Sequence, residues 1–235
     1  MKRYTDLFID FDDTLYDTHG NAVLSLHELF DYFGLGRWFA DPDVFYTNYW
    51  MTNVDLWSRY ARGEITRDYL IVERFRRPLS TGNGFEPTEA FSREVGDKFL
   101  ELCSCKPGVV AGAHQLMDHL KSRGYRMHLC SNGFHEVQYK KLEASHLKDY
   151  FDTICLSEDA GANKPQRAFY EYALKMSGAS VPTTLMIGDN FYTDIAGAKS
   201  VGMDTMFFNV RPDEFQAPEP VTFEVHSLPE IIDIL

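Results

Sequence analysis

The stretch Leu7-Phe8-Ile9-Asp10-Phe11-Asp12-Asp13-Thr14-Leu15 joins a short apolar run to a group of carboxylates and a threonine. In an extended segment residues i and i+2 point to the same side, so Asp10 and Asp12 emerge together where the strand stops. One carboxylate of such a pair can attack a substrate while the other moves a proton. An ordinary strand end with a solvated turn uses the same residue types, because Asp favours turns. The stretch therefore predicts a reactive site only together with motifs further along the chain.

The composition is that of a folded protein with a substantial core. The chain has 235 residues, 44% of them apolar, which suits one large domain or a core with a smaller insert. The formal charge of -12 and the pI near 5.1 argue against a nucleic-acid polymer or an anionic membrane as partner, because both need a basic face. The N-terminal apolar stretch is too brief for a signal peptide and no long apolar run follows, so we expect a cytoplasmic protein.

Residues 18–105 have apolar side chains at helical spacing. The spacing predicts helices near residues 23–33, 43–60, 66–76 and 87–103. All three tryptophans fall in this region, where aromatic residues at helical spacing are typical of a core. Cys103 and Cys105 lie at its end as a single C-x-C pair, which we interpret as free thiols because zinc needs a second pair. A redox or metal role for the pair stays open.

After Pro107 strand-like and helical segments alternate. The pattern predicts strands at 125–130, 153–156, 184–187, 204–208 and 222–225, with helices at 113–121, 136–144, 166–176 and 195–200 and one more at the end. Alternation of this kind predicts an α/β protein with a parallel sheet and helices on its faces.

Polar groups follow four of the expected strands at their carboxyl ends, where open α/β sheets bind ligands. They are Asp10 and Asp12, Ser131-Asn132-Gly133, Lys164, and Asp189. We expect them to converge on one crevice. The Ser131 hydroxyl can donate to an oxyanion, with backbone N–H groups at a helix start beside it, although an ordinary turn uses the same residue.

Lys164 and two later aspartates complete the candidate site. Pro165 suits a first helical position, so we expect Lys164 at a helix start and interpret it as a charge clamp, against the alternative of a solvated lysine. Asp189 and Asp194 lie in a loop that leads into a helix, and their carboxylate oxygens suit Mg²⁺. Asp194 is alternatively the N-cap of that helix.

The set formed by Asp10-x-Asp12-x-Thr14, Ser131, Lys164-Pro165 and Gly188-Asp189 with Asp194 resembles the four motifs of the haloacid dehalogenase (HAD) superfamily. The resemblance implies a Rossmann-like catalytic core, residues 1–17 and 106–235. It also implies a helical cap of the C1 type, residues 18–105, inserted after the first strand. Asp10 would be the nucleophile that forms an aspartyl-phosphate, and Asp12 would protonate the leaving oxygen and then activate water.

The resemblance implies a magnesium site and a phosphate site as well. Mg²⁺ would be held by the Asp10 carboxylate, the Asp12 backbone carbonyl and Asp189, with Asp194 supporting. The phosphate-binding residues would be Ser131, Asn132 and Lys164, of which the lysine also counts as catalytic because it offsets phosphate charge. Asp12 argues against a dehalogenase, since a halide leaving group needs no proton.

Residues 7–17 and the ending Phe207-Phe208-Asn209 are most similar to the YjjG-type pyrimidine 5'-nucleotidases. We therefore expect a Mg²⁺-dependent phosphatase of a small phosphorylated metabolite, with pyrimidine nucleoside 5'-monophosphates as first substrates. A phosphatase of phosphoglycolate or a sugar phosphate, a phosphomutase and a non-catalytic HAD-fold binding protein stay open. Monomer and homodimer are equally compatible with the sequence.

Overall fold

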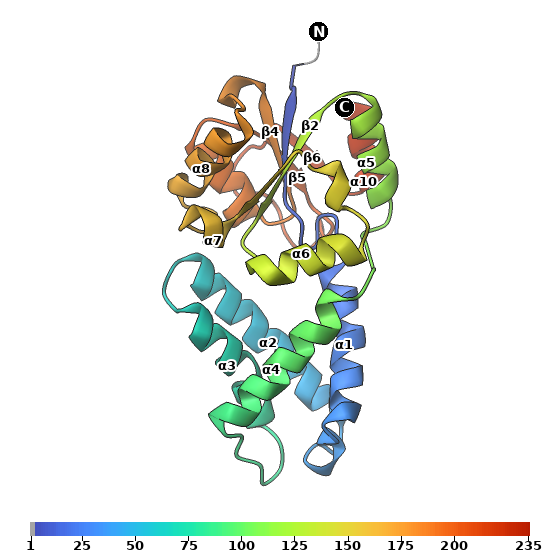
Figure 1. Cartoon of the computed structure of the whole chain (residues 1–235), viewed down its shortest axis with the longest axis vertical. Helices are drawn as coiled ribbons and strands as arrows, with labels where there is room; N and C mark the ends of the chain where they lie inside the picture. The colour runs from blue at the N-terminus through green and yellow to red at the C-terminus, as the bar shows by residue number, and fades with distance from the viewer. Residues whose placement is uncertain (1–2) are drawn as a thin grey trace. The chain divides into compact units, whose positions relative to one another are not determined.

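The computed structural model describes residues 3–235, which form two compact units (Figure 1). One unit contains the residues up to Thr18 together with Pro107–Leu235, and the other contains His19–Lys106. No helix in residues 3–235 combines the length and the apolarity needed to cross a membrane. Which unit carries catalysis and which selects a substrate stays a prediction.

The first unit is built on a parallel sheet of six strands, so the expected α/β fold is confirmed. The strands are β1 (Asp6–Ile9), β2 (Arg126–Ser131), β3 (Thr153–Leu156), β4 (Thr184–Gly188), β5 (Asp204–Phe208) and β6 (Phe223–Val225). Their spatial order is β3-β2-β1-β4-β5-β6, and every neighbouring pair is parallel. The first strand of the chain is therefore central, between β2 and β4.

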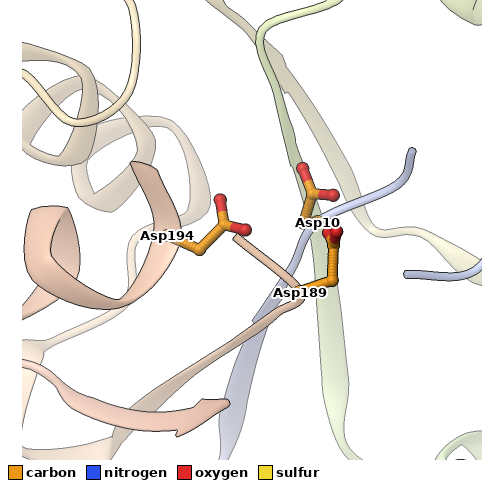
Figure 2. A group of neighbouring side chains, drawn as sticks. All are labelled: Asp10, Asp189 and Asp194. Carbon is orange, nitrogen blue, oxygen red and sulfur yellow. The ribbon is translucent and has the colours of Figure 1, made fainter. Parts of the chain in front are cut away.

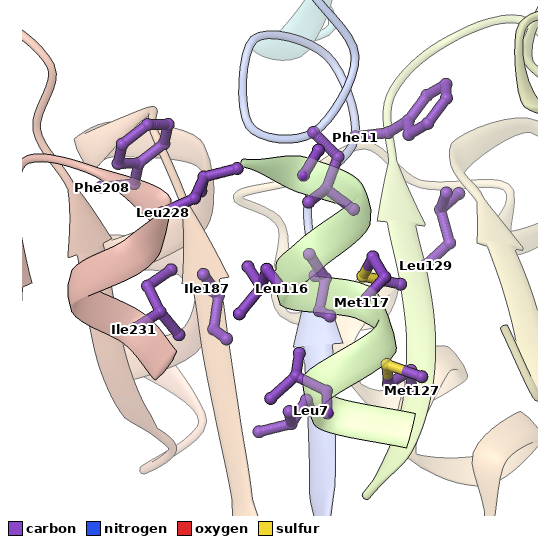
Figure 3. Close-up of a cluster of buried hydrophobic side chains, with 14 of the residues drawn as sticks. Leu7, Phe11, Leu116, Met117, Met127, Leu129, Ile187, Phe208, Leu228 and Ile231 are labelled. Carbon is purple, nitrogen blue, oxygen red and sulfur yellow. The ribbon is translucent and has the colours of Figure 1, made fainter. Parts of the chain in front are cut away.

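Alternating side chains of β1 serve the cores on the two faces of this sheet. Leu7 and Ile9 join the cluster that contains Leu116 and Ile231, from the helices on one face (Figure 3). Phe8, which points the other way, joins a second cluster with Tyr170. Leu7, Phe8 and Ile9 are fully buried. Burying an apolar side chain of this size contributes about 1.5–3 kcal/mol. Two-sided burial explains why the run is apolar throughout.

The helices of this unit lie on both faces of the sheet (Figure 1). They are α5 (Ala113–Ser122), α6 (His135–Ala144), α7 (Ser157–Ala160), α8 (Arg167–Ser177), α9 (Gly197–Ser200) and α10 (Leu228–Ile234), with short turns η2 (Lys148–Tyr150) and η3 (Val181–Thr183). The prediction that a helix begins at residue 195 is wrong, because helical structure begins at Phe191. A π-helix, η4 (Phe191–Ala196), precedes α9, because the Asn190 side chain accepts hydrogen bonds from the Tyr192 and Thr193 N–H groups and begins the helix earlier.

The second unit is helical and has a core of its own. Its elements are α1 (Thr18–Tyr32), which begins in the first unit, η1 (Leu35–Arg37), α2 (Pro42–Ala61), α3 (Arg67–Leu79) and α4 (Glu89–Ser104). Threonine caps begin two of them: Thr66 accepts from the Tyr69 N–H and Thr88 from the Phe91 N–H. Tyr49, Phe75 and Phe99 are buried, with ring centroids 5.3–5.4 Å apart. Cys103, in the last turn of α4, and Cys105, its C-cap, form no disulfide bond within the described residues.

A buried acid and a buried histidine lie on the two neighbouring strands β1 and β2. The Asp6 carboxylate accepts hydrogen bonds from Thr5, at 2.7 Å, and from His128 Nε2, at 3.0 Å, and pairs with Arg126, at 2.6 Å. Burial acts to raise the pKa of Asp6, but these donors outweigh it and lower the pKa below its usual 3.8. Burial lowers the pKa of His128 below its usual 6.5, against the opposing effect of Asp6.

Each of these two shifts contributes stability that is lost in acid. A group whose pKa is lower in the folded state binds more protons when unfolded, so stability is present above the unfolded value and falls as pH drops below it. For His128 this window opens near pH 6.5, and for Asp6 near pH 3.8. Taken alone, the His128 contribution should lower the melting temperature by a few degrees from pH 7 to pH 5. Asp10 and Asp189, whose pKa values are raised, act in the opposite direction, so the measurement compares variants with the wild type. His128→Gln should remove this contribution from the change in melting temperature between pH 7 and pH 5, whereas the exposed His146→Asn should leave that change as in the wild type. If His128→Gln shows the same change as the wild type, His128 does not contribute to the pH dependence.

Candidate active site

Three carboxylates meet at the carboxyl ends of β1 and β4. Asp10 follows β1, Asp189 follows β4, and Asp194 lies in η4. One oxygen from each lies within 4.8 Å of the others, and Figure 2 shows the three side chains turned toward one another. Asp10 and Asp194 are buried and Asp189 is half-buried. These three predicted site residues are therefore brought together by the sheet.

Lys164 is the cation of this group. Its ammonium Nζ lies 2.5 Å from Asp10 Oδ1, 2.7 Å from Asp194 Oδ1 and 2.8 Å from the Cys130 carbonyl oxygen. These partners take all three ammonium hydrogens. The side chain is buried, so the alternative of a solvated lysine is wrong. The expected helix start at Pro165 is also wrong, because α8 begins at Arg167, after its N-cap Gln166.

The two residues after Cys130 are already engaged with the surrounding chain. The Asn132 side chain donates to the Lys164 carbonyl oxygen, at 2.9 Å, and accepts from the Lys164 N–H, at 2.8 Å. It therefore holds the backbone that carries the lysine. The Ser131 hydroxyl accepts from the Gly133 N–H, at 3.0 Å. A phosphate-binding role for Ser131 and Asn132 stays a prediction.

Asp194 is held from inside its helix rather than at the helix end. The alternative that it is the N-cap is wrong, since Asn190 takes that place. Asp194 Oδ2 accepts a hydrogen bond from the Asn190 N–H, at 3.1 Å, while Oδ1 faces Lys164. A Cβ on Gly188 would lie 2.3 Å from Asp194 Oδ2, so only glycine at this strand end lets the carboxylate approach.

The acidic groups and the lysine of this cluster shift one another's pKa values. Burial raises the pKa of Asp10 to about 7, against Lys164 and with Asp194 and Asp12 adding to the increase. Burial, followed by Asp10 and Asp194, raises the pKa of Asp189 well above its usual value. Burial acts to lower the pKa of Lys164, but the two carboxylates outweigh it and raise the pKa. The three carboxyl groups, two of them buried, outnumber the ammonium of Lys164, and their oxygens fit a divalent cation such as Mg²⁺.

Thr14 links two of these carboxylates, a contact that the sequence analysis missed. Its hydroxyl lies 3.2 Å from Asp10 Oδ2 and 3.0 Å from Asp189 Oδ1. Thr14 Oγ1 also accepts a hydrogen bond from the Asp189 N–H, at 3.1 Å. The position of Thr14 within the first motif is a signal that could have found it.

Asp12 is held by a separate set of donors. Its Oδ1 accepts from Lys141 Nζ, at 2.5 Å, and from Thr18 Oγ1, at 2.7 Å; its Oδ2 accepts from Gln138 Nε2, at 2.5 Å. Burial acts to raise the pKa of Asp12, but Lys141 and the other donors outweigh it and lower the pKa. The sequence contains no signal for Gln138 and Lys141, because polar residues of an expected helix are usually solvated.

Comparisons with known proteins point in one direction. The family model for haloacid dehalogenase-like hydrolases matches residues 7–202. The chain is 30% identical to pyrimidine 5'-nucleotidase PynA of Streptococcus pneumoniae, over 99% of this chain and 95% of that protein. It is 31% identical to pyrimidine 5'-nucleotidase YjjG of Escherichia coli, over 97% and 96%. The magnesium-bound crystal structure of HAD-hydrolase YfnB from Bacillus subtilis aligns with a TM-score of 0.87 and 29% identity, over 99% of each chain.

Proposed function

The chain belongs to the haloacid dehalogenase-like hydrolase family, and from this premise we propose that it is a Mg²⁺-dependent phosphatase of small phosphate monoesters. One observation carries the proposal: Asp10 contacts Lys164 and clusters with two further carboxylates, and a second acid, Asp12, lies two residues along the same loop. A nucleophile, a cation for the phosphate and a proton donor are thus present together.

The proposed reaction has two halves. An Asp10 carboxylate oxygen attacks phosphorus and the bond to the ester oxygen breaks. Because its donors lower the pKa of Asp12, Asp12 has to take up a proton when the substrate binds, and it gives that proton to the leaving alkoxide. Asp12 then takes a proton from water, which attacks the phosphorus of the aspartyl-phosphate, so that inorganic phosphate leaves and Asp10 is regenerated. Lys164 and Ser131 would hold the phosphate oxygens in both halves, and Asn132 would contribute through its backbone N–H while its side chain holds the Lys164 backbone.

The metal site follows from the same carboxylates. Mg²⁺ would be held by the Asp10 carboxylate, the Asp12 backbone carbonyl and Asp189, with Asp194 supporting, and when bound it would supply positive charge against which phosphate can approach. The buried carboxylates support this placement, because they exceed the single ammonium of Lys164 in number. In its absence, Lys164 alone offsets the charge of Asp10 and Asp194.

We propose pyrimidine nucleoside 5'-monophosphates as the substrates. The support is that PynA and YjjG, both pyrimidine 5'-nucleotidases, match over at least 97% of this chain. Residues 18–105 would act as the cap that selects the substrate, and 1–17 with 106–235 as the catalytic core. We propose that aromatic side chains of this cap stack on the base; Trp50, whose ring stacks on His19 with centroids 4.3 Å apart, is a candidate because it is only partly buried.

Phosphate release across a panel of monophosphates tests this function. We expect the highest kcat/KM for dUMP, dTMP or UMP, loss of turnover in EDTA, and recovery on adding excess Mg²⁺. Faster turnover of a sugar phosphate or phosphoglycolate would replace the substrate but keep the chemistry. Isomerised product without phosphate release would indicate a mutase, and binding without turnover of any compound would contradict the enzyme proposal.

A further inference from the structure

Helix α6 directs two buried polar side chains at Asp12. Gln138 and Lys141 are three residues apart, so they share one face of the helix. Gln138 is 0% exposed and Lys141 is 7% exposed. Their terminal nitrogens approach different oxygens of the Asp12 carboxylate, each at 2.5 Å. One helical turn therefore holds both ends of this carboxylate.

The contacts of Gln138 fix the orientation of its amide. Nε2 lies 2.6 Å from Ser131 Oγ as well as 2.5 Å from Asp12 Oδ2. A reversed amide would place Oε1, a pure acceptor, against the carboxylate. Space for the side chain depends on Gly133, where a Cβ would lie 2.0 Å from Gln138 Nε2. Gln138 thus ties Asp12 to Ser131, the first residue of the candidate phosphate site.

Lys141 is buried at a cost that a surface lysine does not have. Removing an ammonium from water is unfavourable by several kcal/mol unless a partner compensates it, as a general rule for buried ions. Its ion-pair partner in residues 3–235 is Asp12, and its Nζ lies 5.1 Å from the centroid of the buried Tyr16 ring. The preceding residue, Lys140, is exposed. The two adjacent lysines thus differ in burial and in contact with Asp12.

We propose that Gln138 and Lys141 are positioning residues for Asp12. They hold its carboxylate in a fixed position beside Ser131 while a proton passes to the leaving oxygen. The inference rests on the proposed phosphatase function. Their effect should therefore depend on how much the leaving group needs that proton. An alkoxide from an alkyl ester needs protonation, whereas p-nitrophenolate leaves readily without it.

The test compares kcat/KM for two monoesters, p-nitrophenyl phosphate and the nucleoside 5'-monophosphate that the wild type hydrolyses best. The ratio kcat/KM reports the steps through formation of the aspartyl-phosphate. For Lys141→Met and Gln138→Leu we expect a loss on the order of 10²-fold with the nucleotide and less than about 10-fold with the nitrophenyl ester. Lys141→Arg should recover part of the loss. Lys140→Met, which removes the same charge from the exposed side, should leave both values near wild type.

Equal losses on both esters, or a gain in activity, would overturn the inference, because damage to the fold does not distinguish leaving groups. Thermal unfolding of each variant shows whether it folds. If Lys141→Met or Gln138→Leu does not, the polar variants Lys141→Arg and Gln138→Asn carry the same comparison. A wild type inactive on both esters would defeat the proposed function and with it this inference; an active wild type with unchanged selectivity in every variant defeats the inference alone.

Discussion

Asp10→Asn should abolish phosphate release, with a loss on the order of 10³-fold or more. The amide keeps the size of the carboxylate but lacks its nucleophilic charge, and it weakens the pairing with Lys164 Nζ, now 2.5 Å from Oδ1. Initial rates with the best nucleotide substrate measure the loss. Borohydride reduction of the wild type during turnover should convert residue 10 to homoserine, which peptide mass mapping detects.

The matched control is Asp13→Asn, the same change three residues along the loop. Asp13 is exposed and has a φ of 60°, a conformation that Asn tolerates as well as Asp. We expect it to retain most of the activity. Full activity in Asp10→Asn, or label at another residue after reduction, would show that Asp10 is not the nucleophile.

Lys164→Met should lower both activity and stability. The ammonium is buried between Asp10 and Asp194, and removing one partner of a buried ion pair costs about 3–5 kcal/mol, because it leaves the other charge uncompensated. Activity should fall by a factor on the order of 10² to 10³, since the phosphate loses its cation. Urea unfolding without metal measures the stability term, and adding Mg²⁺ should restore part of it, because the cation compensates the same carboxylates.

Lys175→Met is the control for this variant. It makes the same substitution at an exposed lysine of α8, the helix that follows Lys164 in the chain. Its unfolding free energy should stay within about 0.5 kcal/mol of wild type. A Lys164→Met protein as stable as wild type in metal-free buffer would mean that the lysine does not compensate these carboxylates. If Mg²⁺ changes the unfolding free energy of neither the wild type nor Lys164→Met, the proposed metal does not bind at this site.

The fold was predictable because its signals are periodic and local. Alternation of strand and helix patterns after residue 107 predicted the parallel sheet, and carboxyl ends of parallel strands gather at one edge, which predicted that Asp10, Lys164 and Asp189 would converge. The strand order, with β1 in the centre, was not predicted, because the pattern along a chain does not state which strands are neighbours.

The parts that sequence reasoning missed depend on contacts between distant residues. Gln138 and Lys141 have the polarity of a solvated helix face, and only the packing of α6 buries them against Asp12. The early start of η4 depends on an Asn190 side chain that was interpreted as loop. The two hydrogen bonds by which the Asn132 side chain holds the backbone of Lys164 were not predicted either, while its phosphate-binding role stays a prediction.

The central place of β1 has a consequence for synthesis on the ribosome. Asp10 precedes both strand neighbours of β1, which are β2 and β4, so its surroundings are incomplete until residues near 194 have emerged. The helical unit, residues 19–106, is continuous in sequence and can gather its core earlier. During translation the Asp10 carboxylate is therefore present before Lys164 has been made, and the proposed site is complete only after Asp194 has emerged.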